Sequence, residues 1–253
     1  MRNITNFDLD LLEQFKKIYV LVSGGIDSTY LLELIAAKFP EKTIAVNCYN
    51  PYERNKTLKV ISSFYPYIAV KPNTSYKPAD IIKKAFLNIP GAIELRKKKK
   101  YHKKIFGCCR VFKHSMFKKD PRFREDNTVV ISGIKRGDGS QRMSFLRQLS
   151  MGKWIIGTAN KPNNYYGWAR PTFLHKHKWG STYCYPFRDY TQREIPDDII
   201  AELRLKYPTL NHSGCSICPV LIVFEDLISK KGSKLDLERI ERSKKYYVKI
   251  LER

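Results

Sequence analysis

The chain is 253 residues long and 43% hydrophobic, which is enough for one α/β domain with a substantial core. Its formal net charge is +23, because 47 Lys and Arg outnumber 24 Asp and Glu, and this excess favours a polyanionic partner. No run of 18 apolar residues occurs, which argues against a membrane span, and residues 1–13 do not resemble a signal peptide. We therefore expect a cytoplasmic protein with no membrane partner.

Strand-like and helix-like segments alternate along the first half of the chain. Apolar runs predict strands at residues 18–22, 43–47, 67–70 and 128–132, and amphipathic patterns predict helices at residues 29–39, 54–64 and 79–87. This alternation is typical of a mainly parallel, doubly wound α/β sheet with helices on both faces. We expect a single nucleotide-binding domain over residues 1–226, which includes the cysteines discussed below, and a small basic helical tail over residues 227–253.

A glycine-rich turn joins the first predicted strand to the first predicted helix. Its two glycines let the backbone approach an anion, and the N–H groups at the start of the helix supply donors and a positive field. Serine hydroxyls add further donors, and Asp27 can hold the Mg²⁺ that accompanies a polyphosphate. The turn lacks the Gly-Lys-Ser/Thr ending of a Walker A loop. The nucleotide-binding residues that we predict are Val22, Ser23, Gly24, Gly25, Ile26, Asp27, Ser28, Thr29 and, from a later strand end, Gly133.

Four of the six cysteines form two close pairs, Cys108 with Cys109 and Cys215 with Cys218. In an intracellular chain such pairs indicate a metal or redox chemistry rather than a disulfide framework. Four thiolates can close a tetrahedral zinc site or hold a [4Fe–4S] cluster. Adjacent cysteines suit the separate corners of a cubane better than a compact zinc knuckle, so we prefer the cluster, with zinc or no metal as alternatives.

Five segments, in the same order along the chain, resemble motifs of the phosphoadenosine phosphosulfate (PAPS) reductase family. The SGGIDST turn is similar to the PP-loop, SGGxDS, of the ATP pyrophosphatases. The others are GCCRVFK at residues 107–113, SGIKRGDGSQR at 132–142, YPFRDYT at 185–191 and GCSICPV at 214–220. The resemblance implies an adenine nucleotide alpha hydrolase-like fold that cleaves ATP between the α and β phosphates. It also implies a [4Fe–4S] cluster on Cys108, Cys109, Cys215 and Cys218.

Two departures from this family bear on the activity. Sulfonucleotide reductases use a cysteine near the C-terminus as nucleophile, whereas no cysteine follows Cys218 here. The SGGIDST loop, by contrast, matches the PP-loop motif fully, which favours ATP as the substrate and pyrophosphate as a product. Asn47 and Cys48 also stand in place of an Asp-Thr pair, which weakens the case for adenosine contacts there.

We therefore expect an adenylating PP-loop enzyme for sulfur transfer. The catalytic residues would be Asp27 and Ser28 in the loop, with Lys135, Arg136 and Arg142 stabilising charge at the α-phosphate. One alternative is a sulfonucleotide reductase whose nucleophile is Cys48, Cys184 or an external thiol. Another is a non-enzymatic iron–sulfur protein that binds ATP and nucleic acid.

Residues 96–119 contain 11 basic side chains and no acidic one. A charge run is usually only a solvated face, but one beside a nucleotide site is also what a phosphodiester backbone requires. We predict tRNA or DNA as partner, with a sulfur donor protein or a thiol reductant as a further one. The predicted nucleic-acid contacts are Lys97, Lys98, Lys99, Lys100, Lys103 and Lys104.

Overall fold

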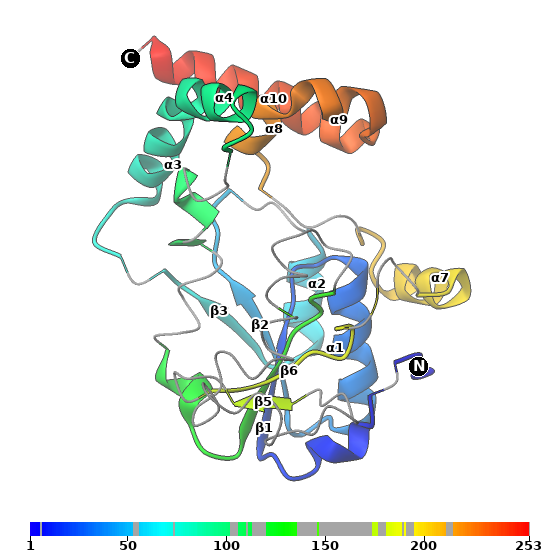
Figure 1. The fold of residues 1–253 in the computed structure, drawn as a ribbon. Coiled ribbons are helices and arrows are strands. Elements are labelled where there is room, and N and C mark those ends of the chain that lie inside the picture. The colour runs from blue at the N-terminus through cyan, green and yellow to red at the C-terminus, as the bar shows by residue number, and fades with distance from the viewer. Residues whose placement is uncertain are drawn as a thin grey trace. The chain divides into compact units, whose positions relative to one another are not determined.

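The computed structural model describes residues 1–5, 7–52, 56–72, 74–101, 106–109, 111–112, 120–135, 146, 174–176, 181–188, 190, 195–210 and 215–252. The chain forms two compact units that interleave in the sequence (Figure 1). Unit 1 comprises Met1–Asn47, Asn55–Val70 and Phe117–Ser213, and unit 2 comprises Cys48–Arg54, Lys71–Met116 and Gly214–Arg253. The sequence patterns predicted a single division near residue 226.

Unit 1 is built on a six-stranded sheet with the order β3-β2-β1-β4-β6-β5. Five strands run parallel, and β5 pairs antiparallel with β6 at one edge. The order reverses at β1, because the chain moves outward through β2 and β3 and then returns to the other side of β1 with β4. The strands are β1 (Lys17–Leu21), β2 (Thr43–Cys48), β3 (Tyr67–Val70), β4 (Thr128–Ile131), β5 (Leu174–Lys176) and β6 (Thr182–Cys184).

The central strands of this sheet are buried on both faces, as parallel strands usually are. On one face, Ile18 and Val20 of β1 belong to the main apolar cluster together with helix side chains. On the other face, Tyr19 meets Phe123 edge-on, with ring centroids 5.0 Å apart. Phe123 belongs to the short 3-10 helix η4 (Pro121–Arg124).

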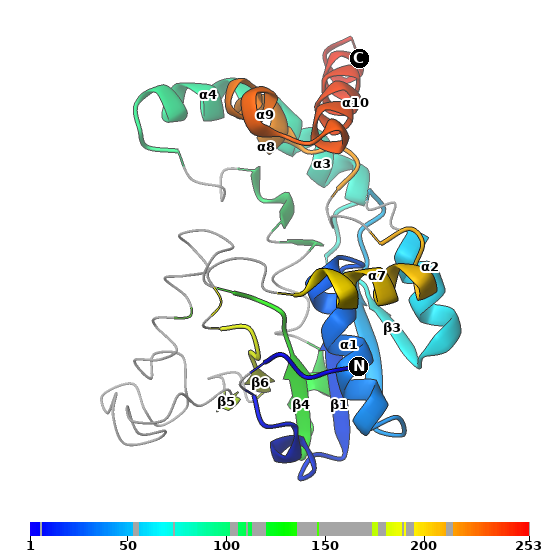
Figure 2. The ribbon, with the colours of Figure 1, turned by 90° about the vertical axis from the view of Figure 1, so that its right-hand side faces the viewer.

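Three helices, α1 (Ile26–Lys38), α2 (Lys56–Phe64) and α7 (Asp197–Lys206), contribute to the same apolar cluster. Figure 2 shows α7 beside α1. A polar cluster links these two helices, because Lys206 Nζ lies 2.9 and 3.0 Å from the two carboxylate oxygens of Glu33. The hydroxyl groups of Tyr65 and Tyr207 also donate to Glu33.

The predicted α/β fold with a parallel sheet is confirmed, and the first four strands and three helices begin and end within three residues of their predicted limits. The sequence patterns did not predict β5 and β6. Each has only three residues, which is too short for a periodic signal. Among the described helices, none is both long enough and apolar enough to cross a lipid bilayer.

Unit 2 is helical in the part that the structure describes. Helices α3, α4, α8 and α10 lie together (Figures 1 and 2) and contribute side chains to a second apolar cluster that includes Phe86, Phe112 and Ile250. Helix α10 packs against α8, α3 and α9. The predicted tail segment is occupied by α9 and α10. The helices are α3 (Pro78–Leu87), α4 (Ile89–Lys97), α8 (Pro219–Val223), α9 (Glu225–Lys231) and α10 (Lys234–Leu251).

Candidate nucleotide and cysteine sites

The glycine-rich loop follows β1, the strand at which the sheet order reverses. Ligands of open α/β sheets bind at such a switch point, beyond the carboxyl ends of the strands. Gly24 has a φ of +70°, a backbone conformation that residues with a Cβ adopt only with strain. Gly25 is the N-cap of α1, so Asp27 and Ser28 lie in the first turn of that helix. The sequence therefore forms a tight turn that ends on a helix N-terminus.

Ser28 fixes the shape of this loop from inside. Its hydroxyl accepts a hydrogen bond from the Ser23 N–H at 3.1 Å and donates one to the Gly25 carbonyl at 3.1 Å. The Ser23 and Ser28 hydroxyl oxygens are themselves 3.1 Å apart. Both hydroxyls therefore lie within the turn, where they maintain its conformation.

The segment after β4 reaches the same loop. Lys135 Nζ lies 2.7 Å from Asp27 Oδ2, and the two side chains are 10% and 24% exposed. A Cβ added to Gly133 would lie 3.8 Å from the Ser28 N atom and 3.4 Å from the Leu31 side chain, so the backbone runs close to α1 here. The structure thus brings together Asp27, Ser28, Gly133 and Lys135. Arg136 and Arg142 lie outside the described residues.

Asn47 is a residue of this site whose role was not recognised from the sequence. It is buried at the end of β2, and its side-chain amide donates to the Val22 carbonyl at 2.7 Å. The bond joins the ends of β1 and β2 where the loop begins. The departure from the Asp-Thr pair of the resembled family was the only signal at this position.

The four paired cysteines all belong to unit 2. Cys108 is buried, and Cys109, Cys215 and Cys218 are half-buried. Burial raises the pKa of the Cys218 thiol to about 11, with nearby Cys215 and Cys109 acting in the same direction. A hydrogen bond with Cys109 and burial raise the pKa of Cys108, to which Cys218 and Cys215 also contribute. These mutual effects place the four thiols in one neighbourhood.

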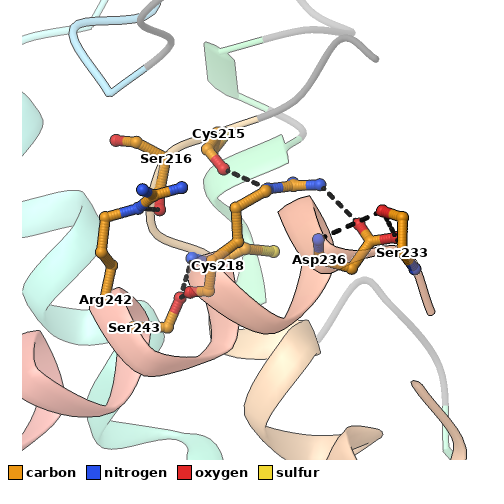
Figure 3. Close-up of polar contacts among 8 residues, drawn as sticks. Cys215, Ser216, Cys218, Ser233, Asp236, Arg242 and Ser243 are labelled. Atoms are coloured by element: carbon orange, nitrogen blue, oxygen red, sulfur yellow. Dashed lines mark hydrogen bonds and ion pairs between the residues drawn. The ribbon is translucent and has the colours of Figure 1, made fainter. Parts of the chain in front are cut away.

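Helix α10 holds the backbone of the Cys215–Cys218 turn (Figure 3). The Ser243 hydroxyl accepts from the Cys218 N–H at 2.9 Å, and Arg239 Nε donates to the Cys215 carbonyl at 3.1 Å. Cys218 is the N-cap of α8, and Pro219 follows in the first turn, where its missing N–H costs nothing. Side chains of α10 therefore hold the cysteine turn, and the last residue of the turn begins α8.

Two uncharged polar side chains lie near the sulfur atoms. The side-chain amide of Asn50 donates to Cys215 Sγ at 3.0 Å. The Tyr101 hydroxyl oxygen is buried and has no hydrogen-bond partner among the residues that the structure describes. Burial, followed by the charges of Cys218, Cys109 and Cys108, raises the pKa of Tyr101 to about 12. The tyrosine hydroxyl thus lies within electrostatic reach of three of the four thiols.

This donor set suits a sulfur-ligated metal group. Thiols are soft ligands, as iron–sulfur clusters and zinc require, and the Tyr101 hydroxyl, which has no partner among the described residues, leaves a donor for a sulfur acceptor. A single tetrahedral zinc ion with Zn–S bonds of about 2.3 Å would hold its sulfurs roughly 3.8 Å apart. Within the described part of the chain, no three His, Cys, Asp or Glu side chains form a group that could hold a metal ion.

The lysines at the start of the basic run are exposed at the end of α4. Lys97 pairs with Glu94 at 2.9 Å, and this contact lowers the pKa of the glutamate. Arg96, by contrast, is used within unit 2, because both of its terminal nitrogens bind Asp226, at 2.6 and 2.7 Å. Lys103 and Lys104 are outside the described residues. The predicted nucleic-acid contacts that the structure describes are Lys97, Lys98, Lys99 and Lys100.

Comparison of the chain with protein-family models and with curated proteins finds no match. The assignment of a function therefore depends on the residues of the two sites themselves.

Proposed function

We propose that the protein is an ATP-dependent adenylating enzyme of the PP-loop type that activates a nucleic acid for sulfur transfer. The observation that carries this proposal is the pairing of Asp27 with Lys135 across the glycine-rich loop at the switch point of the sheet. A carboxylate for a metal ion and a cation for phosphate oxygens are thereby held beside a helix N-terminus. These three features together suit the binding and cleavage of a polyphosphate.

In the proposed reaction, the N–H groups of the loop and of the first turn of α1 bind the β and γ phosphates of ATP. Asp27 would hold Mg²⁺, which when bound would supply positive charge beside the leaving pyrophosphate. Lys135 is directed to the α-phosphate, where negative charge develops, and Arg136 and Arg142 are assigned the same role. Ser28 keeps the loop in the conformation that presents its N–H groups.

The bonds change in two steps. First, an acceptor oxygen of the nucleic acid attacks the α-phosphorus, the bridging P–O bond breaks, and pyrophosphate leaves with both electrons of that bond. Second, hydrosulfide (HS⁻), released by a donor protein or thiol, attacks the activated carbon and forms a C–S bond; the C–O bond breaks, AMP leaves with the former acceptor oxygen, and the sulfur loses its proton to solvent. The exposed lysines Lys97–Lys100 supply the cations that would bind the polyanionic acceptor.

The cysteine site is proposed to hold a [4Fe–4S] cluster on Cys108, Cys109, Cys215 and Cys218. When bound, such a group can supply or relay sulfur, or brace the fold around it. Support comes from the four mutually interacting thiols and from the neutral donors, Asn50 and Tyr101, that lie near them.

Of the two internal cysteines that could serve a sulfonucleotide reductase as nucleophile, Cys48 is half-buried and Cys184 is buried. Sulfonucleotide reduction needs an accessible thiolate, whereas Cys184 on β6 is completely buried, and burial raises its pKa well above the usual value. This internal cysteine is therefore a poor nucleophile and packs as a small apolar side chain.

The nucleotide chemistry is tested with Asp27→Ala. We expect pyrophosphate release from ATP and Mg²⁺, in the presence of total tRNA or DNA, to fall by about 100-fold or more, because Mg²⁺ loses its carboxylate ligand. Asp126→Ala removes an exposed aspartate elsewhere in unit 1 and should leave the rate unchanged. Release of orthophosphate instead of pyrophosphate by the wild type would refute cleavage at the α-phosphate. ATP and nucleic-acid binding with no turnover would support the non-enzymatic alternative.

The metal centre is tested by anaerobic purification. We expect a brown protein with about four irons per chain, and loss of the colour in Cys109→Ser or Cys215→Ser. A colourless protein with stoichiometric zinc would contradict the cluster. Cys184→Ser removes a thiol outside the site and should keep the full iron content.

A further inference from the structure

The proposed cluster site contains two hydrogen-bond donors, Asn50 and Tyr101, that none of the resembled motifs includes. A role for these two side chains rests on the proposed cluster and adds to it. Both belong to unit 2, as do the four cysteines.

The orientation of the Asn50 amide is fixed by its neighbours. Asn50 is 6% exposed, and its Oδ1 accepts a hydrogen bond from the Tyr52 N–H at 3.0 Å, so that its Nδ2 must face the other way. Nδ2 donates to Cys215 Sγ at 3.0 Å. The next residue, Ser216, donates to the Tyr52 carbonyl from its N–H at 2.6 Å and from its hydroxyl at 2.7 Å. The segment around Asn50 is thus bonded to the segment around Cys215 at three points.

Among the described residues, contacts with other aromatic rings hold Tyr101 in place, and its hydroxyl makes no hydrogen bond. Its ring meets that of Phe224 edge-on, with centroids 4.8 Å apart, and lies 6.5 Å from that of Phe106. Its buried hydroxyl has no acceptor among the described residues, although buried hydroxyls normally have one. Tyr101 and Cys109 both pack against the apolar cluster to which Cys108 belongs, so this hydroxyl lies beside the cysteine pair. A sulfur atom of a bound cluster is an acceptor of the kind that this donor lacks.

We propose that Asn50 and Tyr101 are positioning residues that donate hydrogen bonds to the sulfur atoms of the bound cluster and thereby raise its reduction potential. The physical reason is that reduction adds negative charge to the sulfurs. A donor therefore stabilises the reduced state more than the oxidised state.

The test compares reduction potentials rather than activity. Asn50→Leu and Tyr101→Phe each remove one donor while keeping much of the side-chain volume. We expect both variants, purified anaerobically, to keep about four irons per chain and to show a midpoint potential shifted to more negative values in a redox titration followed by electron paramagnetic resonance. The double variant should shift further. Tyr247→Phe removes a tyrosine hydroxyl from the same apolar cluster and should match the wild type.

Wild-type potentials in both single variants, at full iron content, would overturn the inference while leaving the proposed cluster intact. A wild-type protein that contains zinc and no iron would overturn both. If Asn50→Leu fails to fold, as judged by circular dichroism, Asn50→Asp replaces it, because the carboxylate keeps the Tyr52 contact but cannot donate when ionised. Its potential should be more negative than that of the wild type, and an unchanged value would contradict the role of Asn50.

Discussion

At the scale of single residues, the side-chain hydroxyl of Ser243 in α10 positions the cysteine turn by bonding the backbone of Cys218. The residue is completely buried in α10. Its hydroxyl donates to the Arg239 carbonyl at 2.7 Å within the helix and accepts from the Cys218 N–H at 2.9 Å. The hydroxyl therefore satisfies a partly buried backbone donor that would otherwise have to be bonded elsewhere.

Ser243→Ala should lower the free energy of unfolding of the metal-free protein by about 1–3 kcal/mol, because the partly buried Cys218 N–H loses its acceptor. Urea unfolding measures this change. Ser229→Ala, at an exposed position of α9, should change the same quantity by less than about 0.5 kcal/mol. Equal stability of the two variants would show that the Cys218 N–H finds another acceptor.

At the scale of elements, the end of α4 is a helix stop made without glycine. Lys99 has a φ of +56°. Its N–H bonds the Arg96 carbonyl at 2.9 Å, and the Lys100 N–H bonds the Leu95 carbonyl at 2.8 Å, which together form a Schellman motif. The left-handed position usually carries glycine, so a lysine there is strained. Four lysines at a helix C-terminus are also favoured by the helix dipole.

Lys99→Gly should raise the free energy of unfolding by about 1 kcal/mol, because glycine adopts the left-handed conformation without strain. Lys98→Gly is the matched control, since it removes the same charge at a residue with an ordinary φ of −78°. It should instead lower stability by about 0.5–1 kcal/mol. Thermal or urea unfolding distinguishes them, and a destabilised Lys99→Gly would contradict the strain at this position.

At the scale of the whole molecule, the charge of +23 is the property most directly linked to a partner. Each lysine that neutralises a phosphate releases counterions, so affinity for nucleic acid must fall steeply as salt rises. Lys97–Lys100, at the C-terminal end of α4, belong to unit 2, and the glycine-rich loop belongs to unit 1. Nucleic-acid binding and ATP binding should therefore respond to different substitutions.

Replacing Lys97–Lys100 together by Gln should weaken tRNA or DNA binding and reduce the slope of log affinity against log salt by roughly 0.7–0.9 for each phosphate that is no longer neutralised. ATP binding, measured by calorimetry without nucleic acid, should stay at the wild-type value. The control removes the same charge at four other exposed lysines, Lys16, Lys56, Lys59 and Lys83. An equal loss of affinity in both variants would show that only the net charge matters and would contradict a specific role for Lys97–Lys100.

Local patterns determined much of the fold. The apolar run at residues 43–47 and β2 (Thr43–Cys48) coincide almost completely, and the glycine-rich turn lies between β1 and α1, as the sequence predicted. These features depend on neighbours within a few residues, namely on side-chain periodicity and on the conformational freedom of glycine. The adjacent and C-x-x-C cysteines were recognisable in the same way.

Only the tertiary structure decided which distant residues meet. Asp27 and Lys135 are 108 residues apart, and Asn50 and Cys215 are 165 residues apart. Their contacts depend on the strand order and on how the helices of unit 2 pack, neither of which leaves a periodic signal in the sequence. Asn50 and Tyr101 are ordinary residue types without a motif, so their closeness to the sulfurs could not be predicted. The sequence by itself thus determined the local elements and the positions of the cysteine pairs and of the glycine-rich loop. Packing decided which residues they meet, because contacts between distant residues exist only once the chain has folded.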